Sequence, residues 1–476
     1  MAQPRLTEGA VFDGFTVGKR LHRGGMAMLY EVTHPGHAAP LIMKVPLLLE
    51  GEDPATIVGF EMEQMILPRL TGPHVPRFLA AGDFSDQPFI VMERLPGTSL
   101  LPRISALPMP AAEVAAIAAR VATALEAIHR QHVVHLDVKP SNILTREGGE
   151  AVLIDFGLSH HMQLPDLLEE EFRLPYGTAP YMAPEQVMGV RDDPRSDIFA
   201  LGAMMYFFAT GTRPFGDPQT LFDLKRRIWH EPVPPRARNA AVPDWLQETI
   251  LRCLEVDPAR RYPSAAQLGF DLRNPDHVAL TVRAAKLKRD GWRHRLRRRF
   301  DPDARPVFRR LSSLPGASPP APILVVALDI GTPTPVLEAA MRTTVARLLA
   351  TVPAARVACV NVQRHNWMSS DSTFDEEGRN RHVQRLVALR HWAAPLGLPE
   401  GRVTFHVLEA IDAAAALLEY ATANGVDHII LGARPATLRK RLLGGVSSEV
   451  VAQAPCSVTV VRPRTGHQRV PPDAAG

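Results

Sequence analysis

The stretch His132–Leu144, HVVHLDVKPSNIL, constrains the fold of this 476-residue chain more than any other. It follows a long Ala/Leu-rich helical run and precedes a short strand that ends in IDFG. Asp137 can accept a hydroxyl proton, Lys139 can neutralise a moving phosphoryl group, and Asn142 can bind a metal. These residue types suit phosphoryl transfer, because that reaction depends on positioning and charge neutralisation more than on covalent chemistry.

The other parts of a phosphoryl-transfer site follow the order that such a site needs. Lys44 in LIMK lies on a predicted strand, where it could bridge two phosphates, and Glu63 on the next helix is its natural ion-pair partner. Asp155 in IDFG is a second metal ligand, and oxygen donors suit Mg²⁺. Gly24 and Gly25 in LHRGGMAMLY would let the backbone approach phosphates closely.

In this combination the chain resembles the bacterial eukaryotic-type (Hanks-type) serine/threonine protein kinases over about Val11–Asp271. The resemblance implies a bilobal α+β fold, Mg²⁺ or Mn²⁺ with ATP, and protein Ser/Thr hydroxyls as acceptors. It implies that Asp197 braces the catalytic loop and that Arg261 pairs with Glu185. It assigns catalytic roles to Asp137, Lys139, Lys44, Glu63 and Thr178, and the metal to Asn142 and Asp155. For the nucleotide it assigns Leu21, Gly24, Gly25, Leu29, Lys44, Met92 as gatekeeper, Glu93 and Leu95 in the hinge, and Leu144.

Several positions around the expected nucleotide site depart from the family pattern, and Leu29 replaces the valine that usually follows the glycine-rich loop. His22 and Ala27 replace the outer glycines of the phosphate cover, and Ile42 stands where a small alanine usually faces adenine. These departures keep a second hypothesis open, a weakly active or pseudokinase scaffold that binds nucleotide and partners. The intact catalytic side chains favour the active enzyme.

Leu136 stands where most family members have an arginine that pairs with a phosphate on the activation loop. The loop Leu158–Leu174 is poor in hydroxyls, and Ser159 lies too close to the DFG motif for a typical switch site. Glu169–Glu171 supply standing negative charge or form a solvated acidic face. The sequence therefore predicts activity that does not depend on phosphorylation of this loop.

The last zone alternates apolar strands with helices, which predicts a doubly wound parallel sheet. It resembles the universal stress protein family. ATP binding there would involve Asp329, Gly432 and Gly444, but Pro435 departs from the nucleotide-binding pattern. The alternative is a domain that only dimerises or senses another signal.

The sequence thus predicts two domains joined by a linker. The basic zone within that linker, Arg283–Arg310, is either a plain solvated segment or a contact for acidic lipid or nucleic acid. The expected boundaries are 10–275 for the kinase domain (lobes 10–95 and 96–275), 276–320 for a basic and then Pro/Ser-rich linker, 321–464 for the α/β domain, and 465–476 for a disordered tail.

Composition bounds the cellular setting. Apolar residues make up 46% of the chain, and the net charge of +4 is too small to indicate a dedicated nucleic-acid binder. The three cysteines lie far apart, which fits a reducing compartment, and no apolar run is long enough for a membrane span. We expect a cytoplasmic protein in bacterial stress signalling, with protein substrates and a homodimer formed through the C-terminal domain.

Overall fold

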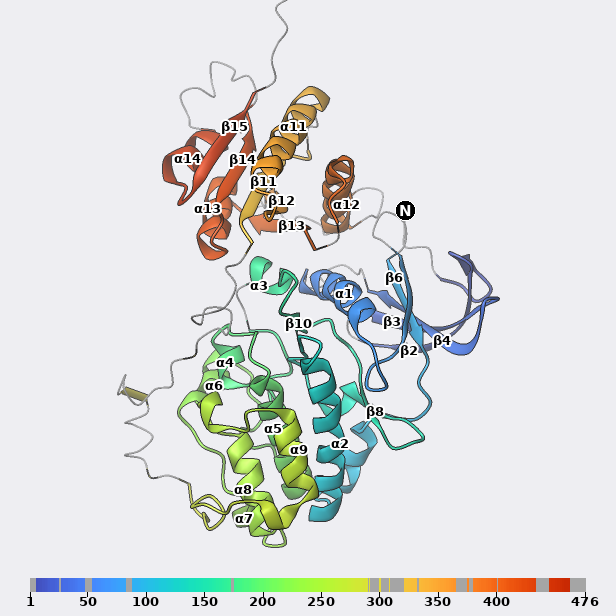
Figure 1. Cartoon of the computed structure of the whole chain (residues 1–476), viewed down its shortest axis with the longest axis vertical. Coiled ribbons are helices and arrows are strands. Elements are labelled where there is room, and N and C mark those ends of the chain that lie inside the picture. The colour runs from blue at the N-terminus through green and yellow to red at the C-terminus, as the bar shows by residue number, and fades with distance from the viewer. Residues whose placement is uncertain are drawn as a thin grey trace, which may run out of the picture. The chain divides into compact units, whose positions relative to one another are not determined.

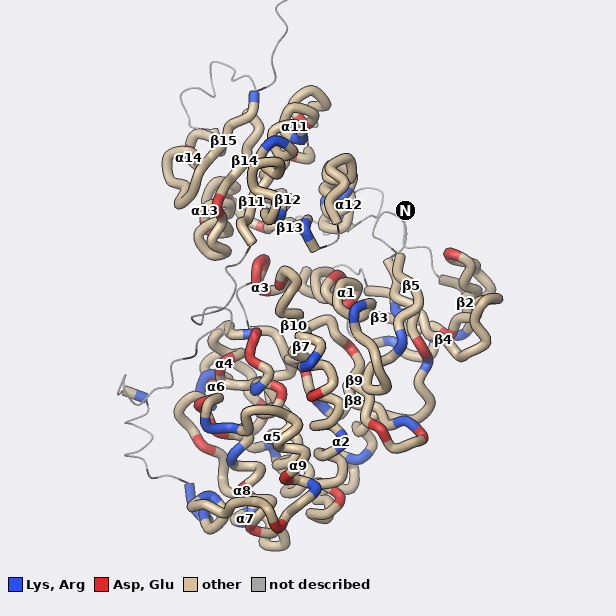
Figure 2. Tube along the Cα trace, in the orientation of Figure 1, with Lys and Arg blue, Asp and Glu red and all other residues tan. Residues whose placement is uncertain are grey.

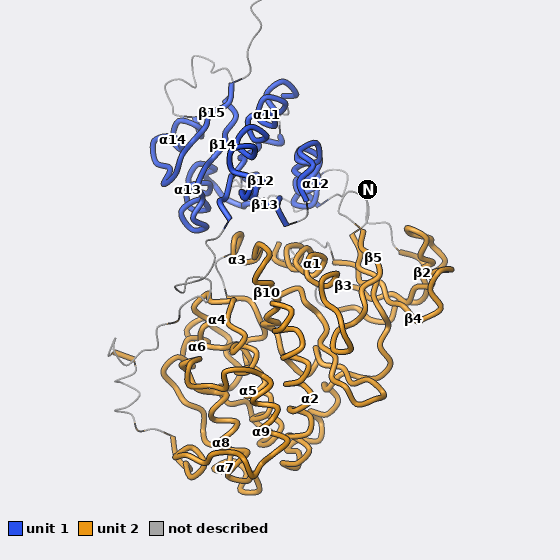
Figure 3. The backbone as a smooth tube through the Cα atoms, viewed as in Figure 1, with its two compact units in different colours: residues 1–3, 320–476 blue, residues 4–319 orange. Residues whose placement is uncertain are grey.

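The computed structural model describes residues 6–24, 27–47, 54–82, 88–172, 175–289, 291, 299–300, 308, 321–331, 334–364, 375, 380–399, 401–433 and 445–462. The chain divides into two compact units, a larger one within residues 4–319 and a smaller one within residues 320–476 (Figure 3). Each unit is described on its own.

The larger unit begins with an antiparallel sheet (Figure 1). Burial alternates along strand β4, so Leu41 and Met43 enter the core of this lobe while Ile42 and Lys44 lie on the other face. In sheet order the strands are β1 (Val11–Phe12), β2 (Phe15–Arg23), β3 (Ala27–His34), β4 (His37–Pro46), β6 (Phe89–Glu93) and β5 (Phe78–Gly82).

Helix α1 (Ala55–Ile66) is the long helix of this small lobe, and it continues into the 3₁₀ turn η1 (Leu67–Arg69). Gly59 lets α1 approach the DFG segment, because a Cβ atom there would lie 3.1 Å from the carbonyl oxygen of Gly157. The same distance separates a Cβ at Gly157 from the Gly59 carbonyl oxygen. The two glycines therefore permit a backbone contact that brings Glu63 of α1 towards Asp155.

Helices make up most of the second lobe. Helices α2 (Ala111–His129) and α5 (Arg195–Thr210) pack together, with α9 (Ala265–Arg273) against α2 and α8 (Asp244–Cys253) against α5. The burial of α5 on nearly all sides makes it the centre of this lobe. The shorter elements are η2 (Leu101–Ala106), η3 (Pro140–Asn142), α3 (Leu167–Glu171), α4 (Pro184–Val187), α6 (Leu221–Lys225), η4 (Arg226–Ile228), α7 (Pro235–Arg238), η5 (Pro258–Arg260) and η6 (Pro275–His277).

Two short strand pairs hold the catalytic segments together. Strand β7 (Val133–Val134) pairs with β10 (His160–His161), and β8 (Ile143–Thr145) pairs with β9 (Ala151–Leu153). The segment between β7 and β8 therefore lies beside the segment between β9 and β10. This arrangement brings the HLDVKPSN and DFG motifs together, and it confirms the predicted small β lobe followed by a helical lobe.

The smaller unit is a parallel five-stranded sheet with helices between its strands, as predicted. The chain runs outward from β11 through β12 to β13 and then crosses back to β14 on the other side of β11, so the topological switch point lies between β11 and β14. In sheet order the strands are β13 (Val403–Ala410), β12 (Arg356–Arg364), β11 (Ile323–Ala327), β14 (His428–Gly432) and β15 (Ser457–Val461), and the helices are α11 (Pro335–Thr351), α12 (Arg381–Ala393), η9 (Ala394–Leu396), α13 (Ala413–Ala423) and α14 (Val446–Gln453).

The first part of the segment assigned to the linker is anchored on helix α8. The Glu248 carboxylate is 2% exposed and accepts hydrogen bonds from Thr281 N (3.0 Å), Thr281 Oγ1 (2.8 Å) and Ala284 N (3.1 Å). Arg283 Nη1 donates to it at 2.9 Å, and Arg283 Nε donates to Glu255 at 2.9 Å. Most of the basic zone beyond Arg289 lies outside the described residues. Buried Gln247 of the same helix also donates from its Nε2 to the carbonyl oxygens of Arg283 (2.8 Å) and Ala284 (3.0 Å). Residues 281–284 thus form a strap in which Glu248 binds the amide and hydroxyl donors and Gln247 binds the carbonyl oxygens.

This strap yields a stability prediction. Glu248→Ala removes the acceptor of several strap hydrogen bonds, so we expect a loss of about 3 kcal/mol in the free energy of unfolding. Trypsin should then cut faster after Arg283 and Lys286. Limited proteolysis with mass spectrometry and chemical denaturation measure both effects. Asp276→Ala, an exposed carboxylate near the strap, is the control, and equal cleavage rates in the two variants would contradict the anchoring role.

Candidate active site

The two lobes meet at Lys44. Its Nζ lies 2.5 Å from Glu63 Oε2 and 2.7 Å from Asp155 Oδ1. Burial lowers the Lys44 pKa, but the charges of Asp155 and Glu63 outweigh burial and raise it above its ordinary value. The pKa of Asp155 is lowered, chiefly by the charge of Lys44. Lys44 is therefore a permanent cation that links α1, β4 and the DFG motif.

Asp137 is the centre of the catalytic loop. Its Oδ1 accepts hydrogen bonds from Thr178 Oγ1 (2.7 Å) and Thr178 N (3.0 Å). Its Oδ2 lies 2.6 Å from Lys139 Nζ and accepts from Asn142 Nδ2 at 3.0 Å. Lys139 Nζ also donates to Thr178 Oγ1 at 2.9 Å. Three residues that the sequence singles out, Lys139, Asn142 and Thr178, thus converge on the Asp137 carboxylate, and Thr178 reaches it from the activation segment.

A buried aspartate fixes the shape of this loop. Asp197, 0% exposed, accepts hydrogen bonds from the His135 amide (2.9 Å), the Leu136 amide (2.8 Å) and His129 Nε2 (2.8 Å). Leu136 has a φ of 62°, a left-handed conformation that costs a branched residue free energy. The two amide bonds to Asp197 hold the chain in that conformation.

The DFG segment packs against the catalytic loop. The Phe156 side chain is 0% exposed, and its ring centroid lies 5.1 Å from that of His135. Asp155 has a φ of 68°, which turns its carboxylate out of the strand direction towards Lys44. Ser159 is also 0% exposed, and its hydroxyl donates to the His135 carbonyl at 3.0 Å. A kinase cannot reach Ser159 in this arrangement, so the residue is structural.

The residues assigned to the nucleotide lie around the β2–β3 hairpin and the hinge. Leu21 and Leu29 lie on the two strands of that hairpin, which the Gly24 amide helps close by donating to the Ala27 carbonyl at 2.9 Å. Met92 pairs across the sheet with Ile42. Leu144 lies on β8 of the helical lobe, and Gly25 lies outside the described residues.

The hinge is held by an ion pair that the sequence analysis missed. The Glu93 carboxylate accepts two hydrogen bonds from Arg146, at 2.7 and 3.1 Å. The hydrogen bonds from Arg146 lower the pKa of Glu93 and burial raises it, and the net effect is a pKa below the ordinary value. The Glu93 side chain thus joins the hinge to the segment after β8. No local signal marks Arg146, because its partner is distant in sequence.

A second missed residue, Arg227, is buried beside the segment that follows Thr178. It is 1% exposed, and it donates to the carbonyl oxygens of Met182, Ala179 (2.7 Å) and Leu224 (3.0 Å). Burial lowers its pKa to about 10. Arg227 therefore supports the main chain that follows Thr178.

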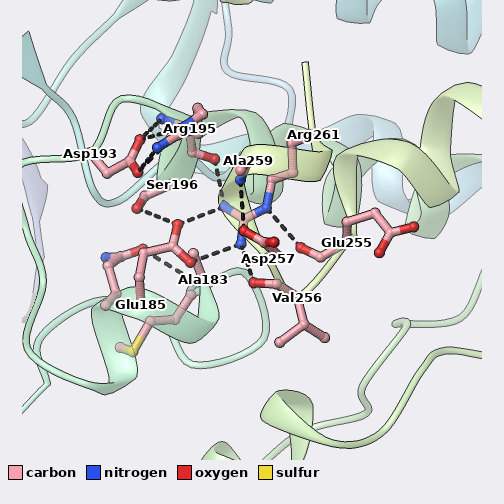
Figure 4. A network of polar contacts seen from close by, with 12 residues as sticks. Ala183, Glu185, Asp193, Arg195, Ser196, Glu255, Val256, Asp257, Ala259 and Arg261 are labelled. Atoms are coloured by element: carbon pink, nitrogen blue, oxygen red, sulfur yellow. Dashed lines mark hydrogen bonds and ion pairs between the residues drawn. The ribbon is translucent and has the colours of Figure 1, made fainter. Parts of the chain in front are cut away.

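The segment after Thr178 is fixed by a buried ion pair. The Glu185 carboxylate accepts from both terminal nitrogens of Arg261, at 2.6 and 2.8 Å, and from Ser196 Oγ at 2.7 Å (Figure 4). Arg261 and Glu185 side chains are 0% and 1% exposed. Figure 4 shows Arg261 also reaching the carbonyl oxygens of Arg195, Glu255 and Val256. Every charged group of the pair is thereby satisfied.

The candidate metal ligands suit Mg²⁺ bound together with a nucleotide. Asp155 retains a 45% exposed carboxylate, and Asn142 lies beside Asp137. The described residues hold no group of three or more His, Cys, Asp or Glu side chains with metal-binding geometry. Mg²⁺ commonly takes one or two protein oxygens and completes its shell with phosphates and water, so this donor set fits the ion.

In the smaller unit, Asp329 follows β11 and Gly432 ends β14, on neighbouring strands at the switch point. Gly432 has a packing reason to be glycine, because a Cβ there would lie 2.9 Å from Leu337 Cδ2 of α11. Arg385 donates to Asn361 Oδ1 at 2.6 Å, and burial lowers its pKa while the Asp329 charge acts in the opposite direction. Gly444 lies outside the described residues.

Comparison with known proteins assigns a family to each unit. The protein kinase domain family matches residues 15–269, and the universal stress protein family matches residues 322–462. A probable serine/threonine-protein kinase of Clostridium perfringens is 33% identical over 234 residues, which is 48% of this chain and 33% of that protein. PknL, a serine/threonine-protein kinase of Mycobacterium tuberculosis, is 30% identical over 291 residues, 60% of this chain and 72% of PknL.

Among solved structures, the crystal structure of the Mycobacterium tuberculosis PknI kinase domain is 26% identical. The match covers 56% of this chain and 98% of the PknI kinase domain, with a TM-score of 0.44. Across the described residues, no helix combines the length and the apolar character needed to cross a membrane.

The Glu185–Arg261 pair yields a matched stability test. Arg261→Ala leaves a buried carboxylate without its main partner, so we expect the free energy of unfolding to fall by about 3–5 kcal/mol. Arg260→Ala, one residue away, removes an exposed side chain whose Nη1 lies 3.7 Å from Glu255 and should cost less than about 1 kcal/mol. Urea denaturation of both variants measures the difference. Equal losses in the two variants would show that leaving Glu185 without Arg261 carries no particular penalty.

Proposed function

Because the chain belongs to the serine/threonine protein kinase family, we propose that it transfers the γ-phosphoryl group of Mg²⁺-bound ATP to serine and threonine hydroxyls of proteins. The observation that carries the proposal is the set of contacts around Asp137, where Lys139, Asn142 and Thr178 meet one carboxylate. This arrangement offers a base and a cation at the point where the acceptor hydroxyl would bind.

Each charged side chain has a defined role in this proposal. Lys44, held by Glu63, orients the nucleotide phosphates, and Asp137 accepts the proton of the substrate hydroxyl. Lys139 neutralises charge that develops on the transferred phosphoryl group. Asn142 and Asp155 hold Mg²⁺, which supplies neutralisation of the phosphate charge when bound.

The alternative, a pseudokinase scaffold, rests on Ile42 and the altered glycine cover. Ile42 lies opposite Met92, so two large side chains stand where the adenine is expected. A β-branched residue there narrows the adenine site, which lowers nucleotide affinity without removing any catalytic group. The intact Lys44–Glu63 pair and the Asp137 cluster favour catalysis.

For the smaller unit we propose a sensing and dimerising role in stress signalling. Strand β15 is an edge strand of the parallel sheet, and most of its residues are at least partly exposed. An exposed edge can pair with the same edge of a second copy. ATP is a second candidate ligand, bound near Asp329, Gly432 and Gly444 at the switch point.

The catalytic proposal predicts the effect of two substitutions. Asp137→Asn removes the base, so we expect kcat to fall by about 10²–10⁴-fold. Lys44→Ala should cause a loss of similar order through lost phosphate positioning. Transfer of radiolabelled phosphate from Mg·ATP to myelin basic protein measures the rate. Asp217→Asn, an exposed carboxylate on the helical lobe, should behave as wild type. Wild-type rates in both active-site variants would refute the proposed phosphoryl-transfer activity.

The dimer proposal predicts that activity depends on protein concentration. Autophosphorylation per molecule should rise with concentration in the full chain, because two kinase domains would phosphorylate each other, and removal of residues 321–476 should reduce that rise. Light scattering and phosphate incorporation measure the two effects. A monomeric full chain whose rate per molecule stays constant would exclude this role.

A further inference from the structure

Leu136 leaves the activation segment without the arginine that holds a phosphate in most relatives. Its side chain is 3% exposed and carries no charge. Its main-chain amide and carbonyl both already have hydrogen-bond partners. The amide donates to Asp197, and the carbonyl accepts from Gln186 Nε2 at 2.8 Å. A segment that is ordered without a phosphate needs other contacts to hold it, and a buried anion within the segment can make them.

Asp166 is such an anion. Its side chain is 5% exposed, although a lone aspartate is seldom buried unless it is paired. Its Oδ2 accepts from Arg191 Nε at 2.6 Å and lies 3.1 Å from His160 Nδ1. Its Oδ1 accepts from the Glu169 amide at 3.2 Å and so caps helix α3. Both oxygens are therefore engaged.

The partners of Asp166 come from separate parts of the chain. His160 lies on β10, which pairs with β7 directly before the catalytic loop. Arg191 follows α4 and the APE motif, and its Nη2 also donates at 2.9 Å to the carbonyl of Leu158, the residue after DFG. One carboxylate and one guanidinium thus connect the beginning, the middle and the end of the activation segment.

The helix that Asp166 caps also supports the small lobe. Leu167 and Leu168 are 4% and 1% exposed, and α3 packs against α1, which carries Glu63. Helix α3 carries the three glutamates of the loop, shown in red in Figure 2. A fixed α3 therefore supports α1 in the position where Glu63 reaches Lys44.

We propose that Asp166, bound by Arg191 and 3.1 Å from His160, is a built-in anionic anchor that positions the activation segment and α1 for phosphoryl transfer without a phosphate. The anchor rests on the proposed kinase function, and it makes Asp166 and Arg191 positioning residues. Burial by itself would raise the pKa of Asp166, but Arg191 and His160 outweigh burial and hold that pKa below its ordinary value. The anchor is therefore charged at neutral pH.

The experiment uses the full chain treated with a protein phosphatase and checked by intact mass. Asp166→Asn keeps the shape of the side chain but removes its charge, so we expect kcat on myelin basic protein to fall about tenfold or more. The KM for ATP should change far less, because the hinge that would bind adenine does not depend on Asp166. Asp166→Glu keeps the charge and should recover part of the rate. Asp412→Asn is the matched control, since it removes another capping carboxylate, in the smaller unit.

Hydrogen exchange provides a readout that does not require activity. Amides of residues 159–172 should exchange faster in Asp166→Asn than in wild type. In Asp412→Asn the same amides should exchange at the wild-type rate. If wild type transfers no phosphate while this difference persists, the kinase proposal fails and the anchor stands. Unchanged kcat with unchanged exchange in Asp166→Asn would overturn the anchor. A tenfold loss of wild-type activity after phosphatase treatment would also overturn it.

Discussion

The buried carboxylate of Asp197 is the contact on which the active site depends. It binds two consecutive amides of the catalytic loop and one histidine of α2, and it comes from the most buried helix of the lobe. The left-handed turn at Leu136 places Asp137 opposite Thr178, and without the two amide bonds the turn would relax. The catalytic geometry is thus set by a group that touches none of the reacting atoms.

Buried ion pairs repeat this role elsewhere in the larger unit. Lys44–Glu63 joins the sheet to α1, Glu185–Arg261 fixes the segment after Thr178, and Asp166–Arg191 fixes the segment before it. Such pairs add little net stability, because desolvation offsets their attraction. They do penalise any arrangement that leaves one charge alone, so they select one position for each segment.

The parts of the site that are local in sequence could be predicted from it. The HLDVKPSN and DFG motifs, Lys44, Glu63 and the strand–helix order all carry their chemistry within short stretches, and the fold class follows from that order. The fastening of the hinge by Arg146, the support from Arg227 and the strap on Glu248 could not be predicted. Each depends on a side chain whose partner is distant in sequence, and an arginine or glutamate at those positions reads as an ordinary surface residue.

A segment held by an aspartate is anchored whenever the larger unit is folded, so this anchor cannot act as a switch in the way that a phosphate does. With Asp166 in that role, control has to act on a different equilibrium. Helix α1 is one candidate, because it carries Glu63, the partner of Lys44, and packs against α3 and the DFG glycine. Self-association through the smaller unit is another, because it changes the local concentration of acceptor hydroxyls without altering the site. A ligand of the smaller unit regulates the kinase only if it binds two arrangements of the chain with different affinity. Leu136 and Asp166 together therefore favour regulation by assembly or by α1 over regulation by loop phosphorylation.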